Sequence, residues 1–244
     1  IIYDPACGSG GMFVQSQKFL KAHDGKNSDI SIHGQEVIDG IWRIAKMNLI
    51  LRGMDASNIH LGDSLKNDKF PENKKANFIL ANPPFGVSTD QNLIDRDDFL
   101  FQTNNKQLAF LQHIYRNLKI GGRAAVIFPD NVLFEEGLGR KIRIDLLNKC
   151  NVKCILRLPN GIFLNSVGNR TNILFFERGN SDLGNTKQIL YYDLRTNSEN
   201  FGKRNRVTSN HFFHFEQIYK KIIEKNEDKN ENSKFVGTSH KLKK

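Results

Sequence analysis

The sequence is poor in cysteine and contains no long run of apolar residues. Its three cysteines, Cys7, Cys150 and Cys154, are an odd number without a CxxC pair, a pattern that suits a reducing cytoplasm and provides no zinc framework. The apolar runs fall far short of the ~18 residues that a membrane-spanning helix needs, and no signal-peptide pattern follows Ile1. These absences exclude a transmembrane protein, and we expect a cytoplasmic protein with neither a metal site nor a membrane partner.

The composition is that of a folded globular protein. Its 244 residues are 39% hydrophobic and 25% charged, which corresponds to one large domain or two small ones. The chain begins at Ile1 without an initiator methionine, and a strand-like run starts at once. We therefore expect it to be a piece of a longer protein.

The net charge of +10 favours a polyanionic partner such as nucleic acid. Much of the excess lies near the C-terminus, because residues 203–244 contain 11 basic and 5 acidic side chains. A charged tail is more often a solvated surface than a specific groove. The charge therefore supports DNA binding only weakly.

Strand-like and helix-like segments alternate through the first 200 residues. Buried-strand patterns occur at 1–4, 31–36, 59–61, 78–81, 123–128, 152–158, 172–176 and 189–194. Helical spacing occurs at 11–23, at 38–53, in a segment that includes 111–118 and closes at 121–122, and at 135–149. The alternation predicts an α/β fold with an open, mostly parallel sheet and helices on both faces, in which ligands bind at the carboxyl ends of the strands.

Two other segments differ from this alternation. Residues 86–105 are polar and lack periodicity, which predicts a mobile loop. After residue 200 the chain becomes basic and irregular, and an amphipathic helix follows at about 211–225 with Ser209 or Asn210 as its N-cap. We expect its apolar face to pack on protein. The boundary near residue 200 separates a main domain, 1–200, from a basic extension, 201–244.

A glycine-rich turn follows the first strand, in the segment Asp4 to Gly11. Glycine lets the backbone approach a ligand, and the helix start after it offers free N–H groups to an anion. The pattern is not GxGxxG, and an acid at this strand end would repel a pyrophosphate. Asp4 instead suits an ammonium group, so the loop fits an amino-acid headgroup, although a plain glycine turn is also common.

Two further acids stand at the ends of the next two strands. Glu36 can accept hydrogen bonds from both hydroxyls of a ribose, and Asp63 can bind the exocyclic amine of an adenine. Taken singly, each is an ordinary surface charge. Together with Asp4 they describe S-adenosylmethionine.

The segment Asn82 to Phe85 is the most specific signal in the chain. Two consecutive prolines after an asparagine make a stiff strand exit, which could be a purely structural feature. The functional interpretation is the methylation of a planar nitrogen. The Asn82 side-chain oxygen and the Pro83 carbonyl can accept its two hydrogens and stabilise the positive charge that builds on it. Phe85 offers a stacking face, and a paired adenine would have to be extruded from the duplex to reach the site.

The order of these motifs resembles a known family. DPACGSGG, GQE, GDS and NPPFG occur in the order found in amino-methylating DNA methyltransferases, and LAFLQHIYRNLKIGGRAAVIFPDNVLF, LRLPNGIF, TNILFF, YYDLRTN and FGKRN follow. Together they resemble the modification (M) subunit of type I restriction-modification systems, from Ile1 to about Lys221. NPPF alone is shared with RNA and protein-glutamine methyltransferases, so the full series carries the resemblance.

The resemblance implies a Rossmann-like, S-adenosylmethionine-dependent methyltransferase fold over 1–200 and adenine-N6 methylation of double-stranded DNA. It implies cofactor contact by Asp4, Pro5, Ala6, Gly8, Ser9, Gly10, Gly11, Glu36 and Asp63. It implies catalysis by Asn82, Pro83, Pro84 and Phe85. The implied partners are a specificity (S) subunit that chooses the site, a second M subunit and a restriction (R) subunit. Family members also have a helical region before the cofactor motif, so we expect this chain alone to bind cofactor weakly.

Two alternatives remain open at this point. A methyltransferase for protein glutamine or RNA meets the same chemical problem, although Phe85 stands where the glutamine enzymes typically have tyrosine. The second alternative is a non-catalytic assembly module that holds the specificity subunit or DNA. The intact NPPF motif argues against it.

Overall fold

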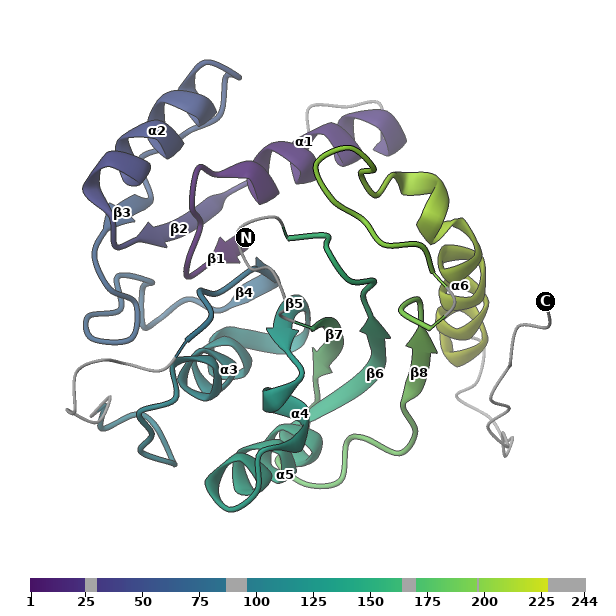
Figure 1. Ribbon diagram of the computed structural model, residues 1–244. Helices are drawn as coiled ribbons and strands as arrows, with labels where there is room; N and C mark the ends of the chain where they lie inside the picture. The colour runs from purple at the N-terminus through teal and green to yellow at the C-terminus, as the bar shows by residue number, and fades with distance from the viewer. Residues whose placement is uncertain (25–29, 87–95, 164–169, 197, 228–244) are drawn as a thin grey trace.

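A computed structural model describes residues 1–24, 30–86, 96–163, 170–196 and 198–227 (Figure 1). Within these ranges the strands form one sheet in the order β3-β2-β1-β4-β5-β7-β6-β8. Every neighbouring pair is parallel except the two that β7 makes, with β5 and with β6. The strands are β1 Ile2–Asp4, β2 Ile32–Glu36, β3 Ile59–Leu61, β4 Ala76–Ala81, β5 Leu118–Pro129, β6 Cys150–Arg157, β7 Thr171–Arg178 and β8 Leu190–Asp193.

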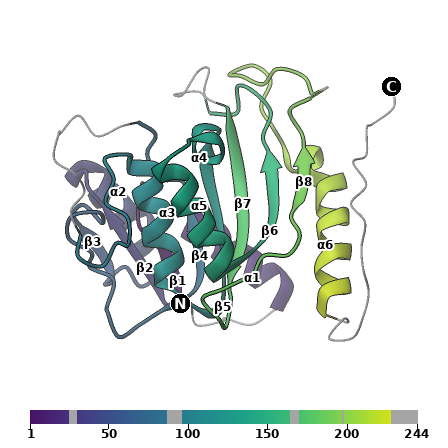
Figure 2. The ribbon, with the colours of Figure 1, turned by 90° about the horizontal axis from the view of Figure 1, so that it is seen from below.

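Helices cover both faces of this sheet. They are α1 Gly11–Asp24, α2 Asp39–Ile50, α3 Lys106–Asn117, α4 Asn131–Phe134, α5 Leu138–Lys149 and α6 Phe213–Glu227, the last preceded by the short helix η1 Ser209–Phe212. Figures 1 and 2 show α3 and α5 along one face, α1 on the opposite face and α6 beside β8. The predicted α/β architecture is confirmed.

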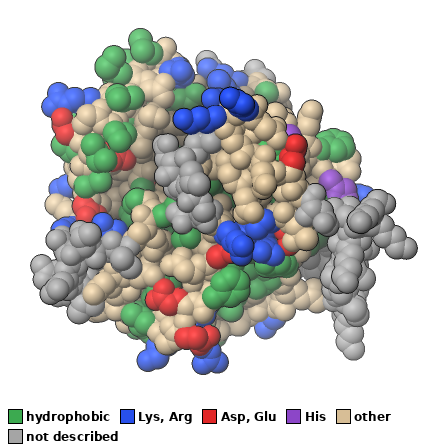
Figure 3. Space-filling view, viewed as in Figure 1, with side chains coloured by type: hydrophobic (Ala, Val, Ile, Leu, Met, Phe, Trp, Pro, Cys, Tyr) green, Lys and Arg blue, Asp and Glu red, His purple; other side chains and the backbone are tan. Residues whose placement is uncertain are grey.

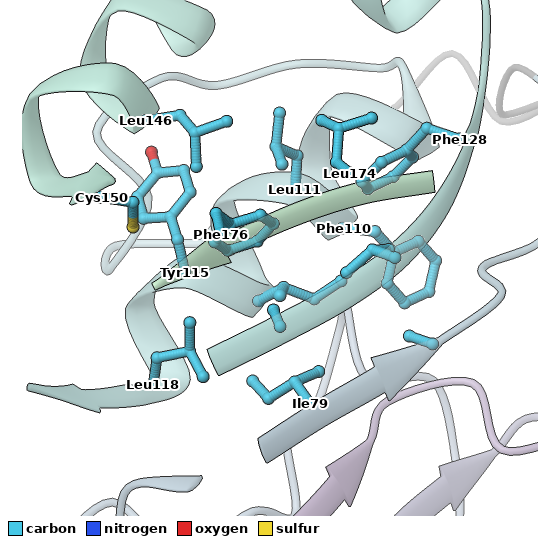
Figure 4. Packing of buried hydrophobic residues seen from close by; sticks show 14 of the residues in the cluster. Ile79, Phe110, Leu111, Tyr115, Leu118, Phe128, Leu146, Cys150, Leu174 and Phe176 are labelled. Carbon is cyan, nitrogen blue, oxygen red and sulfur yellow. The ribbon is translucent and has the colours of Figure 1, made fainter. Parts of the chain in front are cut away.

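Three clusters of buried apolar side chains hold these layers together. The largest lies between the sheet and the helices α3 and α5, and Leu111, Tyr115 and Phe176 belong to it (Figure 4). A second joins α1 and α2 to β1, β2 and β3. The third lies on the other face of β6 and β7, where Phe215 of α6 is buried. Burial of these apolar surfaces is the main force that fixes the strand ends in place.

The helix predicted to close at Gly121 and Gly122 ends earlier. Leu118 already pairs with Ala76 of β4 as the first residue of β5. Gly121 has a φ of +74°, and a Cβ at Gly122 would lie 2.7 Å from the Ala76 carbonyl oxygen. The glycines thus form an irregular stretch of strand. Leu118 fits the helical pattern because it is buried in the same cluster as the inner face of α3.

Two other expectations need correction. The helix predicted at 135–149 is α5, which begins three residues later, at Leu138, because Gly137 at φ +62° separates it from the short helix α4. The predicted mobile loop lies partly at 87–95, outside the described residues. Residues 96–105 are not loose, because Phe99 and Thr103 are buried and the Asn105 side chain caps α3.

The C-terminal helix is confirmed as an amphipathic element whose apolar face packs on the sheet. It begins slightly differently from the prediction, because Thr208 and not Ser209 or Asn210 is the N-cap of η1. All three cysteines are free and buried, and burial raises the pKa of Cys150 and Cys154 to about 12. In the described part of the chain, no helix is long and apolar enough to cross a bilayer.

Candidate active site at the carboxyl ends of the strands

The predicted site residues come together because β3, β2, β1 and β4 are adjacent and parallel. Asp4 ends β1 and Glu36 ends β2, while Asn82 directly follows β4 and Asp63 comes two residues after the end of β3. Parallel neighbours place their carboxyl ends at the same edge of a sheet. The four loops that sequence analysis singled out therefore share one edge.

The turn between β1 and α1 is shaped by glycine. Gly8 and Gly10 have φ values of +53° and +78°, in the left-handed region that favours glycine. A Cβ at Gly8 or at Gly11 would meet no atom within 4 Å. The turn therefore leaves open space beside the first residues of α1, where backbone N–H groups can face an anion.

Glu36 links the end of β2 to this turn. Its Oε2 accepts a hydrogen bond from the Gly8 amide at 3.1 Å, and its Oε1 accepts one from the Ile38 amide at 2.9 Å. Each carboxylate oxygen has a second lone pair. Glu36 is therefore held in one orientation and can still accept hydrogen bonds from a vicinal diol.

Asp4 is the most deeply buried of the three acids, with 2% of its surface exposed. Its Oδ1 accepts a hydrogen bond from the Ala6 amide at 3.0 Å. Burial, with a smaller contribution from the charge of Glu36, raises the pKa of Asp4 to about 7. An ammonium group at this carboxylate would favour its ionised form.

Asp63 lies in a turn that is tied to the other two loops. Its Oδ1 accepts a hydrogen bond from the Leu65 amide at 2.9 Å. Before it, the Gly62 amide donates to the Glu36 carbonyl oxygen at 2.9 Å, and after it the Ser64 hydroxyl donates to the carbonyl oxygen of Pro5. These bonds fix the three acidic loops relative to one another.

The Asn82 to Phe85 segment leaves β4 as irregular chain. Asn82 and Pro84 are exposed, Pro83 is buried and Phe85 is half-buried. Ala81, just before it, pairs with Val126 in the middle of the sheet. The segment thus stands on a rigid strand end with the Asn82 side chain accessible to a ligand.

Sequence reasoning missed two features of this edge. Phe163, in the loop after β6, meets the Phe85 ring edge-on, with centroids 6.3 Å apart and an interplanar angle of 85°. Val37, next to Glu36, is an apolar side chain that exposes 59% of its surface at this edge. The sequence contains Phe163 in LRLPNGIF and Val37 after Glu36, but neither pattern indicates that the side chain lies at this edge of the sheet.

The donor set fits S-adenosylmethionine. A buried carboxylate suits its ammonium, the open helix start suits its carboxylate, and Glu36 and Asp63 suit the ribose and the adenine. Within the described ranges, no group of three or more His, Cys, Asp or Glu side chains could hold a metal ion. The residues at this edge can therefore bind an organic cofactor. The neighbouring loop 82–85 can accept hydrogen bonds from an amine.

Comparison with known proteins gives consistent results. The family model N-6 DNA Methylase matches residues 1–241. The type I restriction enzyme EcoKI methylase subunit of Escherichia coli K12 is 41% identical over 241 residues, covering 90% of this chain and 45% of that protein. The crystal structure of the EcoKI M protein superposes with a TM-score of 0.82 at 40% identity, covering 90% of this chain and 49% of that one.

Two further structures agree with this. A modification subunit of a putative type I restriction enzyme from Vibrio vulnificus YJ016 gives a TM-score of 0.78 at 30% identity, over 90% of this chain and 48% of that one. A putative class I S-adenosylmethionine-dependent methyltransferase from Listeria monocytogenes gives a TM-score of 0.60 at 21% identity. The match covers 79% of this chain and 57% of that one. The methyltransferase fold is therefore confirmed. The chain spans about half the length, or less, of the type I relatives.

Proposed function

The chain belongs to the N-6 DNA methylase family, and from this premise we propose that it is the catalytic core of a site-specific adenine-N6 DNA methyltransferase. We assign it to the modification subunit of a type I restriction-modification system that acts in the cytoplasm. The observation that carries the proposal is the Asn82 to Phe85 loop at the end of β4, because β4 is the direct neighbour of the strand that ends in Asp4.

Cofactor binding is assigned to the loops after β1, β2 and β3. When bound, S-adenosylmethionine supplies an electrophilic methyl group on a sulfonium. Asp4 would hold the ammonium, while Pro5, Ala6, Gly8 and Gly10 shape the turn so that the amides of Ser9 and Gly11 face the carboxylate. The Gly10 amide itself closes the turn by donating to the Cys7 carbonyl oxygen at 2.8 Å. Glu36 would bind the ribose hydroxyls and Asp63 the adenine amine. The hydrogen bonds that join these three loops support a single preorganised pocket.

Catalysis is assigned to the loop after β4. The Asn82 side-chain oxygen and the Pro83 carbonyl would accept the two amine hydrogens of a target adenine and stabilise the charge that builds on nitrogen. Pro84 limits the movement of the loop. Phe85 would stack on the extruded base, and the edge-on contact with Phe163 supports a defined ring position. No strong general base is needed, because the methylated nitrogen loses its proton easily.

The partners follow from the same assignment. We propose that the full-length protein binds double-stranded DNA together with a specificity subunit, a second M subunit and a restriction subunit. Residues 1–200 would form the catalytic domain, and 201–244 a basic extension. The named type I relatives support a DNA substrate over a glutamine or RNA substrate.

The variant Asn82→Ala in the full-length protein with its specificity subunit tests this proposal. We expect methyl transfer to fall by roughly 100-fold or more, because a preorganised acceptor is lost. Cofactor affinity, measured by calorimetry, should stay within a few fold. The control is Asn73→Ala, an exposed position before the start of the same strand, which should leave both unchanged. Equal loss of transfer and of cofactor binding in Asn82→Ala would refute the role given to Asn82.

A further inference from the structure

Arg195 lies in the YYDLRTN segment, two residues after the end of β8, and the reaction as described gives it no role. We propose that Arg195 is a positioning residue, which fixes the loop carrying Phe163 so that the target base meets a preformed aromatic pocket. The proposal rests on the proposed function and names a further residue for the same site. Only 6% of the Arg195 side chain is exposed, so its guanidinium is committed to protein contacts.

The guanidinium of Arg195 joins the two stems of the loop between β6 and β7. Nε donates to the Leu158 carbonyl oxygen at 3.0 Å, and Nη2 donates to the Thr171 carbonyl oxygen at 2.8 Å. Leu158 comes directly after β6, and Thr171 is the first residue of β7. A single side chain therefore holds the beginning and the end of this loop.

The same guanidinium ties the loop to the end of β5. Nη1 and Nη2 donate to the two carboxylate oxygens of Asp130 at 2.8 and 3.0 Å. The side-chain Nδ2 of Asn172 also donates to Asp130 Oδ1, at 2.8 Å. Burial raises the pKa of Asp130, but these hydrogen bonds outweigh it and keep that pKa below its usual value. Asp130 follows β5, the strand that pairs with β4 below the catalytic loop. The clamp therefore connects the β6–β7 loop to the strand beside Asn82.

The clamped loop carries the aromatic partner of Phe85. Five residues after Leu158, Phe163 makes the edge-on contact with the Phe85 ring. In between, the Phe201 amide donates to the Asn160 carbonyl oxygen at 3.2 Å, so the loop is held at a second point. Displacement of a substrate-positioning group by about 1 Å can cost roughly 100-fold in rate. A loosened stem at Leu158 would displace Phe163 in this way.

Arginine is required here by geometry as well as by charge. Its planar fork directs several N–H donors at a carboxylate and at two carbonyl groups simultaneously, whereas a lysine ammonium is a compact charge on a flexible stem. Arg195→Lys therefore keeps the charge but cannot reach all three acceptors. We expect it to behave much more like Arg195→Ala than like the wild-type protein.

The structure offers a matched control at the opposite end of β7. Arg178 is also largely buried and donates to the Lys149 carbonyl oxygen at 2.6 Å and to Asp182 at 2.6 Å. It ends β7, whereas the Arg195 clamp holds the first residue of that strand. Arg178→Ala thus removes a comparable set of hydrogen bonds far from Phe163.

The experiment uses the full-length protein with its specificity subunit. In Arg195→Ala we expect kcat/KM for duplex DNA to fall by about 10- to 100-fold, while the Kd for S-adenosylmethionine stays within about 2-fold. Amide hydrogen exchange should accelerate at 158–163. Arg178→Ala should leave kcat/KM and amide exchange at 158–163 unchanged, even if its Tm falls as much as that of Arg195→Ala.

Two results would overturn the role of Arg195. One is unchanged exchange at 158–163 in Arg195→Ala, and the other is an equal loss of kcat/KM in Arg178→Ala. If instead the wild-type protein methylates no adenine, the proposed function fails. The amide exchange then decides separately whether Arg195 fixes the loop.

Discussion

At the scale of single residues, the buried carboxylate of Asp4 makes cofactor binding depend on pH. Its pKa is raised to about 7, chiefly by burial, so the carboxylate that would bind the ammonium is mostly protonated at pH 6 and mostly ionised at pH 8. Because the folded-state pKa of this acid lies above its unfolded value, Asp4 itself stabilises the cofactor-free fold at low pH, and that contribution is lost as pH rises through 7. The ammonium group of a bound cofactor would instead favour the ionised form of Asp4.

We therefore expect the affinity for S-adenosylmethionine to rise by about 10-fold between pH 6 and pH 8. Isothermal calorimetry of the full-length protein measures this directly. The control is Asp4→Asn, which keeps an acceptor for the Ala6 amide. This variant should bind S-adenosylmethionine weakly, and its affinity should not change between pH 6 and pH 8. An unchanged pH profile in Asp4→Asn would show that another group titrates.

The site residues that sequence could predict are those with local signatures. Asp4, Glu36 and Asn82 each end or directly follow a strand, so the strand pattern alone placed them at one edge. Phe163 and Arg195 were not predicted, because their roles depend on contacts with residues 78 and 65 positions away, Phe85 and Asp130. Such contacts leave no periodic pattern in the chain.

At the scale of elements, Arg96 ties the start of the segment 96–105 to the turn after β3 and to α3. Arg96 Nη1 donates to the Ser64 carbonyl oxygen at 2.8 Å and to His113 Nδ1 at 3.0 Å. Since a guanidinium only donates, the other nitrogen of His113 carries the proton and faces the Tyr3 hydroxyl at 2.8 Å. Burial lowers the pKa of His113 to about 4, so the ring stays neutral near pH 7.

Arg96→Ala should lower the free energy of unfolding by about 3 kcal/mol, because it leaves the buried partners of the guanidinium without a donor. Urea denaturation followed by circular dichroism measures the change. Arg116→Ala is the matched control, because both arginines contact Asp98 Oδ2, Arg96 Nη2 at 2.6 Å and Arg116 Nε at 3.5 Å. The Arg116 side chain is 38% exposed, and its loss should cost less than about 1 kcal/mol. Equal effects of the two variants would mean that the network around His113 contributes little.

The element boundaries show where a sequence pattern reaches its limit. In β6 the residues Cys150 to Leu156 alternate between buried and half-buried without interruption. The pairing with β7 nevertheless shifts between Val152 and Cys154, so Val152 lies in the cluster beneath α5 and Cys154 in the cluster beneath α6. Burial alternation could predict the strand, but a β-bulge moves the following side chains to the opposite face without altering the pattern.

At the scale of the whole molecule, the fold could be predicted from the sequence, whereas the net charge of +10 does not identify a DNA-binding face. The alternation of strands and helices predicted the parallel sheet, and the adjacency of β3, β2, β1 and β4 turned four separate loops into one site. Among the strands that the structure describes, β7 alone pairs antiparallel with its neighbours, which no local pattern signals. Lys and Arg lie in several separate groups on the face in Figure 3 rather than in one stripe, so the charge alone does not define a DNA path.

We propose above all that this chain forms the part of a methyltransferase that modifies adenine at N6. The most direct test incubates the full-length protein and its specificity subunit with S-adenosylmethionine and duplex DNA, then digests the DNA and identifies the nucleosides by mass spectrometry. We expect N6-methyladenine with the wild-type protein and roughly 100-fold less, or none, with Asn82→Ala. Methyl groups found only on cytosine, RNA or protein glutamine, or N6-methyladenine formed equally by both proteins, would contradict it.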